Sequence, residues 1–166
     1  YYNGDYKPIG NSNWQAKQQG SGMDNGELFN GNIRNMTTSI EEFMDPHGSF
    51  GTKYTYDQLN RIKTMESFQG LDETINSWGI NQSGISNAYN TEYTYDPNGN
   101  ILSLNRKTEI GTPLDNLRYN YIVDKNQLEY VQDVAGIKNK DIGTQNPNNY
   151  RYDDIGNLKT DITEGI

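Results

Sequence analysis

Cysteine is absent from this chain of 166 residues, and histidine occurs once, at His47. The lack of thiols excludes disulfide bonds, cysteine-based zinc sites and a thiol nucleophile within the chain. Runs of about 18 apolar residues, which a membrane-spanning helix needs, are also missing. Hydrophobic residues make up only 32% of the chain, and its mean hydropathy is −0.97. This composition is lean for a protein that folds around one compact core.

Catalytic and metal-binding motifs are missing as well. The sequence contains no nucleophile elbow, no zinc-protease helix motif and no phosphate-binding loop. His47 stands between proline and glycine, a context typical of a turn. The stretch Asp96–Asn98 begins like a calcium loop, but Ile101 and Lys107 occupy the positions that require Gly and Glu. We therefore predict a non-enzymatic chain with no catalytic, cofactor-binding or metal site.

Positive charge is scarce. The chain has 22 acidic and 14 basic residues, which gives a net charge of −8. An acidic surface repels polyanions, and no basic stripe is present to neutralise phosphates, so nucleic acid is excluded as a partner. Neutral glycans stay open as partners, because tyrosine rings can stack on sugars and asparagine side chains can both donate and accept hydrogen bonds.

Tyrosine is abundant by contrast, with 13 residues. Pairs of tyrosines one residue apart recur at irregular intervals of a few tens of residues, a spacing that indicates repeated supersecondary units. Side chains alternate across a strand, so both members of a pair lie on one face of an incoming strand. The pairs are Tyr54 and Tyr56, Tyr93 and Tyr95, Tyr119 and Tyr121, and Tyr150 and Tyr152.

Three of the pairs lead directly into the same turn pattern. An Asp begins the turn and can accept hydrogen bonds from backbone N–H groups ahead of it, while the fourth position needs a left-handed residue. The turn aspartates are Asp57, Asp96 and Asp153, and the left-handed positions are Asn60, Gly99 and Gly156. This pattern predicts a type I turn closed by a left-handed residue and a bulge. The Tyr119 copy has its Asp later, at Asp124, so its turn type stays open.

Each returning strand begins with an apolar residue, at Ile62, Ile101, Leu128 or Leu158. A further apolar residue follows three positions later in three copies. Three is an odd interval, so the two residues point to opposite faces unless a bulge intervenes. The residues concerned are Met65, Leu104 and Val131.

These hairpins resemble YD repeats, the building unit of Rhs proteins, of the C component of insecticidal Tc toxins and of teneurins. The stretch 28–38, which contains Asn30-Gly31-Asn32-Ile33, is similar to a phrase common in Rhs proteins, and the resemblance extends over about 28–162. It implies an all-β fold in which YD-repeat hairpins form an open strip of a larger spiralling β-sheet shell. Residues 1–27 then form an irregular lead-in, and 28–166 are the YD-repeat segment. A tyrosine-rich β-sandwich is the alternative fold.

The resemblance also implies a function. The chain would be a structural segment of a secreted or cell-surface Rhs-type protein from bacteria, and part of a shell that encloses a toxin or other cargo. Its partners would be adjoining YD repeats, which cover the edges of an open strip, the enclosed cargo and secretion machinery. The alternative function is a cell-surface adhesion or glycan-binding module built on the same repeats, and an enzyme comes third.

Overall fold

The computed structural model describes residues 28, 30–39, 49–72, 77–78, 87–135 and 142–166. The chain divides into two compact units, 1–90 and 91–166. The described residues form eleven β-strands and no helix, which confirms the predicted all-β fold. The predicted lead-in, 1–27, and His47 lie outside the described residues.

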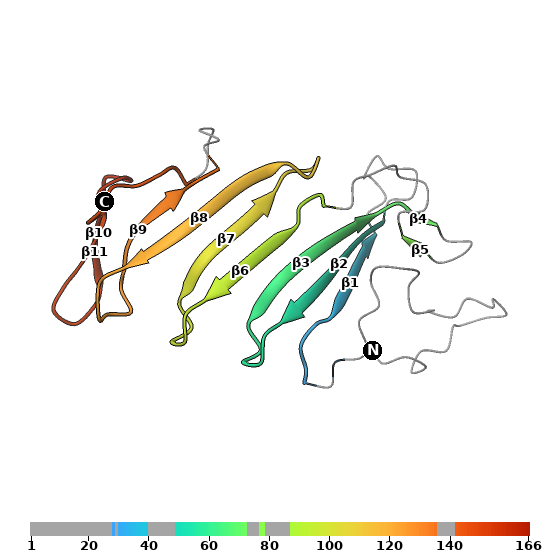
Figure 1. Cartoon of the computed structure of the whole chain (residues 1–166), viewed down its shortest axis with the longest axis horizontal. Coiled ribbons are helices and arrows are strands. Elements are labelled where there is room, and N and C mark those ends of the chain that lie inside the picture. The colour runs from blue at the N-terminus through green and yellow to red at the C-terminus, as the bar shows by residue number, and fades with distance from the viewer. Residues whose placement is uncertain (1–27, 29, 40–48, 73–76, 79–86, 136–141) are drawn as a thin grey trace. The chain divides into compact units, whose positions relative to one another are not determined.

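In the first unit three antiparallel strands lie side by side in chain order (Figure 1). They are β1 (Asn35–Ser39), β2 (Ser49–Tyr56) and β3 (Ile62–Gln69). Two short strands, β4 (Leu71–Asp72) and β5 (Ser77–Trp78), pair with each other. The β2–β3 hairpin carries the first Tyr pair, which occupies the end of β2.

The indole ring of Trp78 covers part of this sheet. Trp78 is buried, with 6% of its surface exposed. Its ring lies over Gly51 of β2, where an added methyl group would meet indole carbons at 2.9–3.2 Å. Phe68 packs beside it, with ring centroids 6.4 Å apart. The absence of a side chain at Gly51 therefore makes room for the ring.

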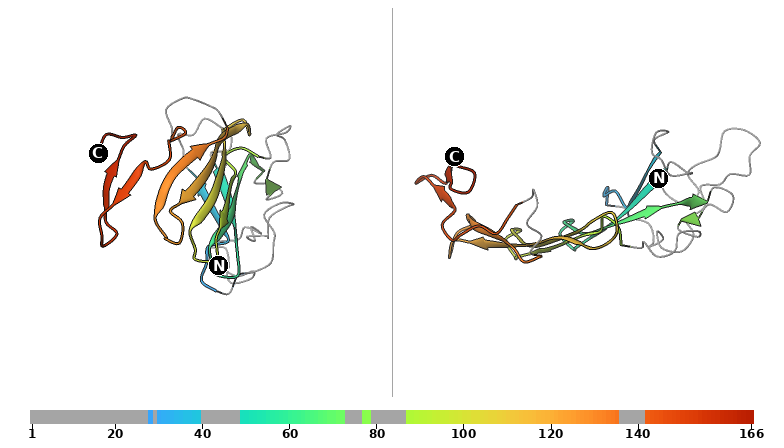
Figure 2. Two further views of the ribbon diagram at one scale, coloured as in Figure 1. Left: turned by 60° about the vertical axis from the view of Figure 1, so that its left-hand side comes forward. Right: turned by 90° about the horizontal axis from the view of Figure 1, so that it is seen from above.

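In the second unit four antiparallel strands also follow chain order. They are β6 (Thr91–Tyr95), β7 (Ile101–Lys107), β8 (Pro113–Tyr121) and β9 (Leu128–Asp133). The last hairpin, β10 (Tyr150–Tyr152) with β11 (Leu158–Asp161), forms its own two-stranded sheet and is turned away from β9 (Figure 2). Apolar burial in this unit centres on Leu117 and Val131, which are 1% and 2% exposed.

The three turns that begin with Asp have the predicted backbone conformation. Their fourth residues have positive φ angles of 62° at Asn60, 95° at Gly99 and 92° at Gly156. In the Asp96 turn, Gly99 N donates to Asp96 O at 3.1 Å, and Asp96 N donates to Asn100 O at 2.9 Å. Two residues thus face Asp96, which is the predicted bulge. The same pair of bonds recurs at Asp57 and Asp153.

The hairpin of the Tyr119 copy also forms, with a different turn. Lys125 N donates to Ile122 O at 3.0 Å, and Ile122 N donates to Gln127 O at 2.9 Å. Asp124, but not Val123 before it, has a positive φ, of 60°. A positive φ at the third position of a turn and not at the second is the pattern of type II. The late Asp therefore supplies the left-handed residue of this turn.

A second bulge lies at the start of each returning strand. In the β6–β7 hairpin, Tyr95 is opposite Ile101 and Thr94 is opposite Ser103, so Leu102 is an extra residue. The corresponding extra residues are Lys63, Glu129 and Lys159. One extra residue reverses the alternation of side chains. Met65, Leu104 and Val131 therefore lie opposite the first tyrosines of their hairpins, Tyr54, Tyr93 and Tyr119.

The left-handed glycines provide a direct test of the turns. Replacing Gly156, whose φ is 92°, by valine should destabilise the β10–β11 hairpin by about 1–2 kcal/mol, because a β-branched residue is forced into the left-handed region. Gly143→Val is the matched control, since a side-chain carbon added at Gly143 would have no neighbour within 4 Å. Hydrogen exchange of the hairpin amides measures both. Equal exchange in the two variants would contradict the assigned turn.

Candidate functional site: the tyrosine face

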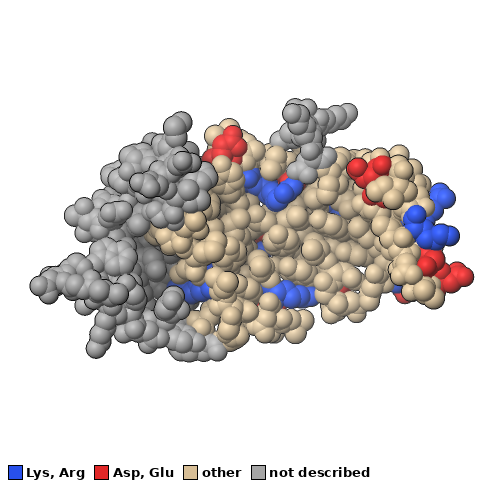
Figure 3. Space-filling model, turned by 180° about the vertical axis from the view of Figure 1, so that it is seen from behind, with Lys and Arg blue, Asp and Glu red and all other residues tan. Residues whose placement is uncertain are grey.

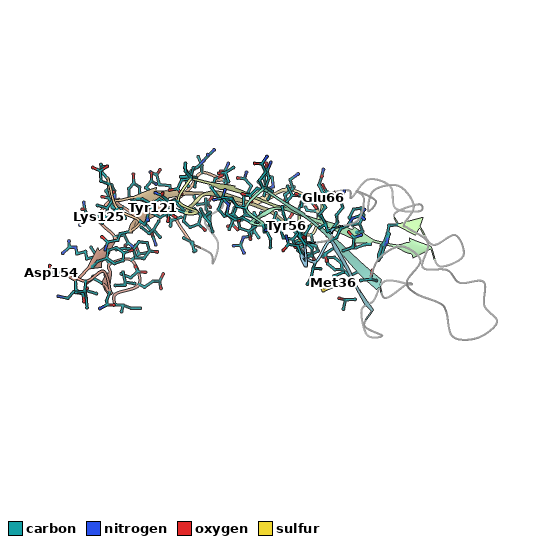
Figure 4. All side chains as sticks on the ribbon, turned by 90° about the horizontal axis from the view of Figure 1, so that it is seen from below. Met36, Tyr56, Glu66, Tyr121, Lys125 and Asp154 are labelled. Carbon is teal, nitrogen blue, oxygen red and sulfur yellow. The ribbon has the colours of Figure 1, made fainter. Side chains whose placement is uncertain are left out.

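The paired tyrosines gather on one side of the sheet in each unit. We call this side the tyrosine face, and it comprises the Tyr pairs with their cross-strand partners. In the second unit the rings of Tyr93 and Tyr95 are nearly parallel, with centroids 6.3 Å apart. In the first unit Met36 and Tyr56 lie on one side of the strands and Glu66 on the other (Figure 4). The two tyrosines of a pair therefore share a face, as the sequence predicts.

The cross-strand partners of the tyrosines repeat from hairpin to hairpin. The second tyrosine of each pair is opposite the first apolar residue of the returning strand, which is Ile62, Ile101, Leu128 or Leu158. The first tyrosine is opposite Met65, Leu104 or Val131 in three hairpins. In the fourth hairpin Asp161 is opposite Tyr150, and this carboxylate accepts a bond from Asn149 Nδ2 at 2.9 Å.

Tyrosine hydroxyls join one hairpin to the chain that precedes it. The hydroxyl of a second tyrosine donates to the carbonyl of an apolar residue, which is either the first residue of β7 or β9 or Ile33, two residues before β1. We call this contact the tyrosine joint. The joints run from Tyr56 to Ile33 O at 2.6 Å, from Tyr121 to Ile101 O at 2.9 Å and from Tyr152 to Leu128 O at 2.9 Å.

The joint occupies a place that backbone pairing does not reach. Pairing between β7 and β8 begins at Ser103 opposite Arg118, so Ile101 lies beyond the end of this ladder. The bulge residue of the β6–β7 hairpin, Leu102, lies between Ile101 and the first paired residue, Ser103. Tyr121 then supplies the donor that the Ile101 carbonyl needs. A side chain thus extends the contact between neighbouring hairpins past the bulge.

Burial disfavours deprotonation of these hydroxyls. It raises the pKa of Tyr56, Tyr121 and Tyr152 above the ordinary value of 10.0. The pKa of Tyr119 is raised by burial and, to a smaller extent, by Tyr93. Loss of the proton would remove the donor from each joint, so the raised pKa values extend the range of alkaline pH over which the joints stay intact.

Removing one joint hydroxyl should weaken the contact without disturbing the ring. Tyr121→Phe leaves the carbonyl of Ile101 without its donor, and we expect a loss of about 0.5–1.5 kcal/mol in the free energy of unfolding. Tyr130→Phe, on the opposite face of β9, is the matched control. Chemical denaturation of both variants measures the difference. Equal stability of the two variants would mean that the joint contributes nothing.

Asparagine side chains connect neighbouring turns along the same edge. Asn60 Oδ1 accepts from Asn30 Nδ2 at 2.8 Å and from Asn32 Nδ2 at 3.0 Å. In the second unit Asn126 Oδ1 accepts from Asn100 Nδ2 at 2.9 Å and from Asn98 Nδ2 at 3.2 Å. Asn126 follows Lys125, which is labelled in Figure 4, in the longer turn of the Tyr119 copy. Each of these contacts therefore reinforces a tyrosine joint at the turn end of the strands.

The turn aspartates fasten their own loops. Oδ1 of Asp96 accepts from Asn100 N at 2.8 Å, and its Oδ2 accepts from Asn100 Nδ2 at 2.8 Å. Asp153 makes the same two bonds with Asn157, and Asp57 uses Arg61 in that place. These bonds favour the charged carboxylate, so they lower the pKa of all three groups below the ordinary 3.8. The largest cause is the backbone N–H of Arg61 at Asp57, and the side-chain amide of the following Asn at Asp96 and Asp153.

The lowered pKa values predict a loss of stability in acid. A carboxylate with a lower pKa in the folded state stabilises the fold above the unfolded pKa of about 4, and this contribution disappears as the pH falls below it. Asp153→Asn should therefore flatten the decline of melting temperature between about pH 5 and pH 2. Asp154→Asn, at the adjacent exposed position, should follow the unmodified protein. Parallel curves for the two variants would contradict the assignment.

Among the described residues, two ion pairs join side chains that are directly opposite each other on paired strands. Lys53 Nζ lies 3.3 Å from Glu66 Oε2, on the face opposite the tyrosines. On the tyrosine face, Arg106 Nε donates to Asp115 Oδ2. The side chain of Asp115 is 1% exposed and that of Arg106 is 38% exposed. The buried carboxylate is thus held by a guanidinium that reaches the surface.

Two contacts between hydroxyl side chains were not predicted from the sequence. The hydroxyl pairs Thr55 with Thr64 and Thr94 with Ser103, each at 2.6 Å, recur opposite the tyrosine face. The Thr between the two tyrosines of a pair is a weak signal for one hydroxyl of each contact. The position of the other hydroxyl, on the returning strand, depends on the bulge.

Uncharged side chains dominate the face seen in Figure 3, where charged side chains occur in small separate groups.

Within the described ranges, no group of three or more His, Asp or Glu side chains is placed to hold a metal ion. The same part of the chain has no helix long and apolar enough to cross a membrane. No protein-family model and no curated protein matches the chain.

Proposed function

We propose that the chain is a non-enzymatic structural segment of an Rhs-type YD-repeat protein. Its hairpins would form part of the wall of a β-shell that encloses a toxin or other cargo for delivery. The observation that carries the proposal is the recurrence of the tyrosine joint. Tyr121 and Tyr152 each bond to the first apolar carbonyl of the hairpin before them, both at 2.9 Å.

A joint of this kind supports a wall because it can be repeated. The β8–β9 and β10–β11 hairpins each offer a tyrosine donor on the incoming strand, and the hairpin before each offers a carbonyl acceptor at its bulge, so the two junctions have the same geometry. Stability in such arrays is roughly the sum of unit and nearest-neighbour terms. A strip can then lengthen without a larger core.

The distribution of apolar residues supports the same function. Few of the described hydrophobic residues are buried, and they are Trp78, Ala88, Leu117 and Val131. In the part of the second unit that is described, β6 to β9 make one layer (Figure 2). A one-layer sheet is suited to bounding a volume, whereas a solid domain packs two or more layers. The partners would be adjoining repeats, the cargo and secretion machinery, in an exported or cell-surface protein.

Limited proteolysis of the protein encoded by the complete reading frame tests the proposal. The cargo should resist protease in the unmodified protein and in the Tyr130→Phe control. In the double variant Tyr121→Phe and Tyr152→Phe, which removes two joints, the cargo should be cleaved faster. A reading frame with an anchoring tail and no cargo segment, together with binding to neutral glycans on an array, would instead establish the adhesion function.

A further inference from the structure

A short segment before β10 takes the place of a strand along the outer edge of β9. β9 pairs with β8 on its other side. Gln145 N donates to Val131 O at 2.8 Å, and Val131 N donates to Gln145 Oε1 at 2.9 Å. The backbone C=O and N–H of Val131 are thus both hydrogen-bonded, as they would be to a paired strand. The C=O accepts from the backbone of Gln145, and the N–H donates to its side chain.

The same segment also bonds to Asp133, two residues further along β9. Thr144 Oγ1 donates to Asp133 O at 2.8 Å. Gln145 is 6% exposed, and Val131 beneath it is 2% exposed. Pro147 follows two residues later and has no N–H to donate to a ladder. The segment therefore occupies the edge without presenting a continuous new edge of its own.

The same glutamine also holds the next hairpin. Gln145 Nε2 donates to the hydroxyl of Tyr150 at 2.9 Å. The β10–β11 hairpin forms a separate sheet. Among the described residues, hydrogen bonds from side chains, and not a backbone ladder, connect it to β9 and to the segment that covers β9. The second of these is the joint from Tyr152 to Leu128.

We infer that Gln145 caps the edge of β9 against strand addition by a second copy of this chain and fastens the β10–β11 hairpin to that edge. An uncovered edge strand presents N–H and C=O groups that pair readily with another chain. Gln145 already forms hydrogen bonds with the N–H and C=O of Val131, which an added strand would need for pairing. The inference does not depend on the proposed function, because it concerns this edge alone.

The test replaces Gln145 with methionine, which has a similar length and no hydrogen-bonding amide. In the 166-residue chain, Gln145→Met should speed hydrogen exchange of the Val131 amide about tenfold, the equivalent of about 1.4 kcal/mol for one buried donor left unpaired. Sedimentation velocity should show self-association that increases with concentration. Gln132→Met, at an exposed position of the same strand, should match the unmodified protein in both measurements.

Two more variants separate the roles of the glutamine. Gln145→Glu, measured at a pH at which its carboxyl group is protonated so that no unpaired charge is buried, keeps an acceptor for Val131 N and a hydroxyl that can donate to Tyr150, so the slow exchange and the monomer should persist. Tyr150→Phe should loosen the β10–β11 amides and leave Val131 unchanged. Amides of β7 and β8 report in every variant whether the unit is folded. Unchanged Val131 exchange in Gln145→Met, or equally fast exchange in Gln145→Glu, would overturn the inference.

Discussion

Replacing Trp78 with alanine should lower the free energy of unfolding of the first unit by about 3–5 kcal/mol, the range for removing a buried aromatic side chain. Trp78 is 6% exposed and fills the space above Gly51 left by the missing side chain. Its loss would leave a cavity against Phe68 and the strand backbone. Chemical denaturation followed by circular dichroism measures the change.

Two further substitutions examine the same contact. Trp78→Phe retains part of the packing and should cost clearly less than alanine. Gly51→Ala places a methyl group 2.9 Å from the indole, and overpacking of this kind costs about 1–3 kcal/mol. If Trp78→Ala and Trp78→Phe proved equally stable, the indole would not be the packing centre of the first unit.

Replacing Arg106 with methionine should cost the second unit about 3–5 kcal/mol, because it removes the guanidinium that is bonded to a buried carboxylate. The carboxylate of Asp115 has a side chain only 1% exposed and accepts a bond from Arg106 Nε. Equilibrium unfolding in urea gives the difference between the variant and the unmodified protein.

The double variant Arg106→Met with Asp115→Leu is the control for this pair. Apolar residues of similar volume often replace a buried ion pair without loss, so the double variant should recover most of the stability that Arg106→Met loses. A single variant within about 1 kcal/mol of the unmodified protein would mean that Asp115 does not depend on Arg106.

Turn chemistry is the part of this fold that the sequence predicts best. Asp57, Asp96 and Asp153 act on backbone groups within four residues of themselves, and Gly99 supplies its positive φ without help from distant residues. Such local conformations follow from the residues that adopt them. The all-β class and the shared face of the tyrosines follow equally from short-range alternation.

The second bulge is harder to foresee, because its extra residues carry no common signature. Lys63, Leu102, Glu129 and Lys159 differ in size and charge, and none is glycine. The repeated interval of three between apolar residues is the available signal, and it allows two interpretations. Only the strand register decides that Met65 joins the tyrosine face.

Contacts between distant segments lie further beyond the sequence. Arg106 meets Asp115 because β7 and β8 pair in a particular register. Gln145 reaches Val131 through a connection with no regular pattern, and Trp78 reaches Gly51 from a two-residue strand. In each case one partner has no local feature that identifies the other, so three-dimensional placement is required.

Electron cryo-microscopy of the protein encoded by the complete reading frame tests the central claim most directly. We predict that the strands of each unit form part of a wall around an enclosed volume, with Tyr121 and Tyr152 bonded to the preceding hairpins as they are here. A compact domain in which these strands surround no enclosed volume and the two tyrosine joints are absent would contradict it.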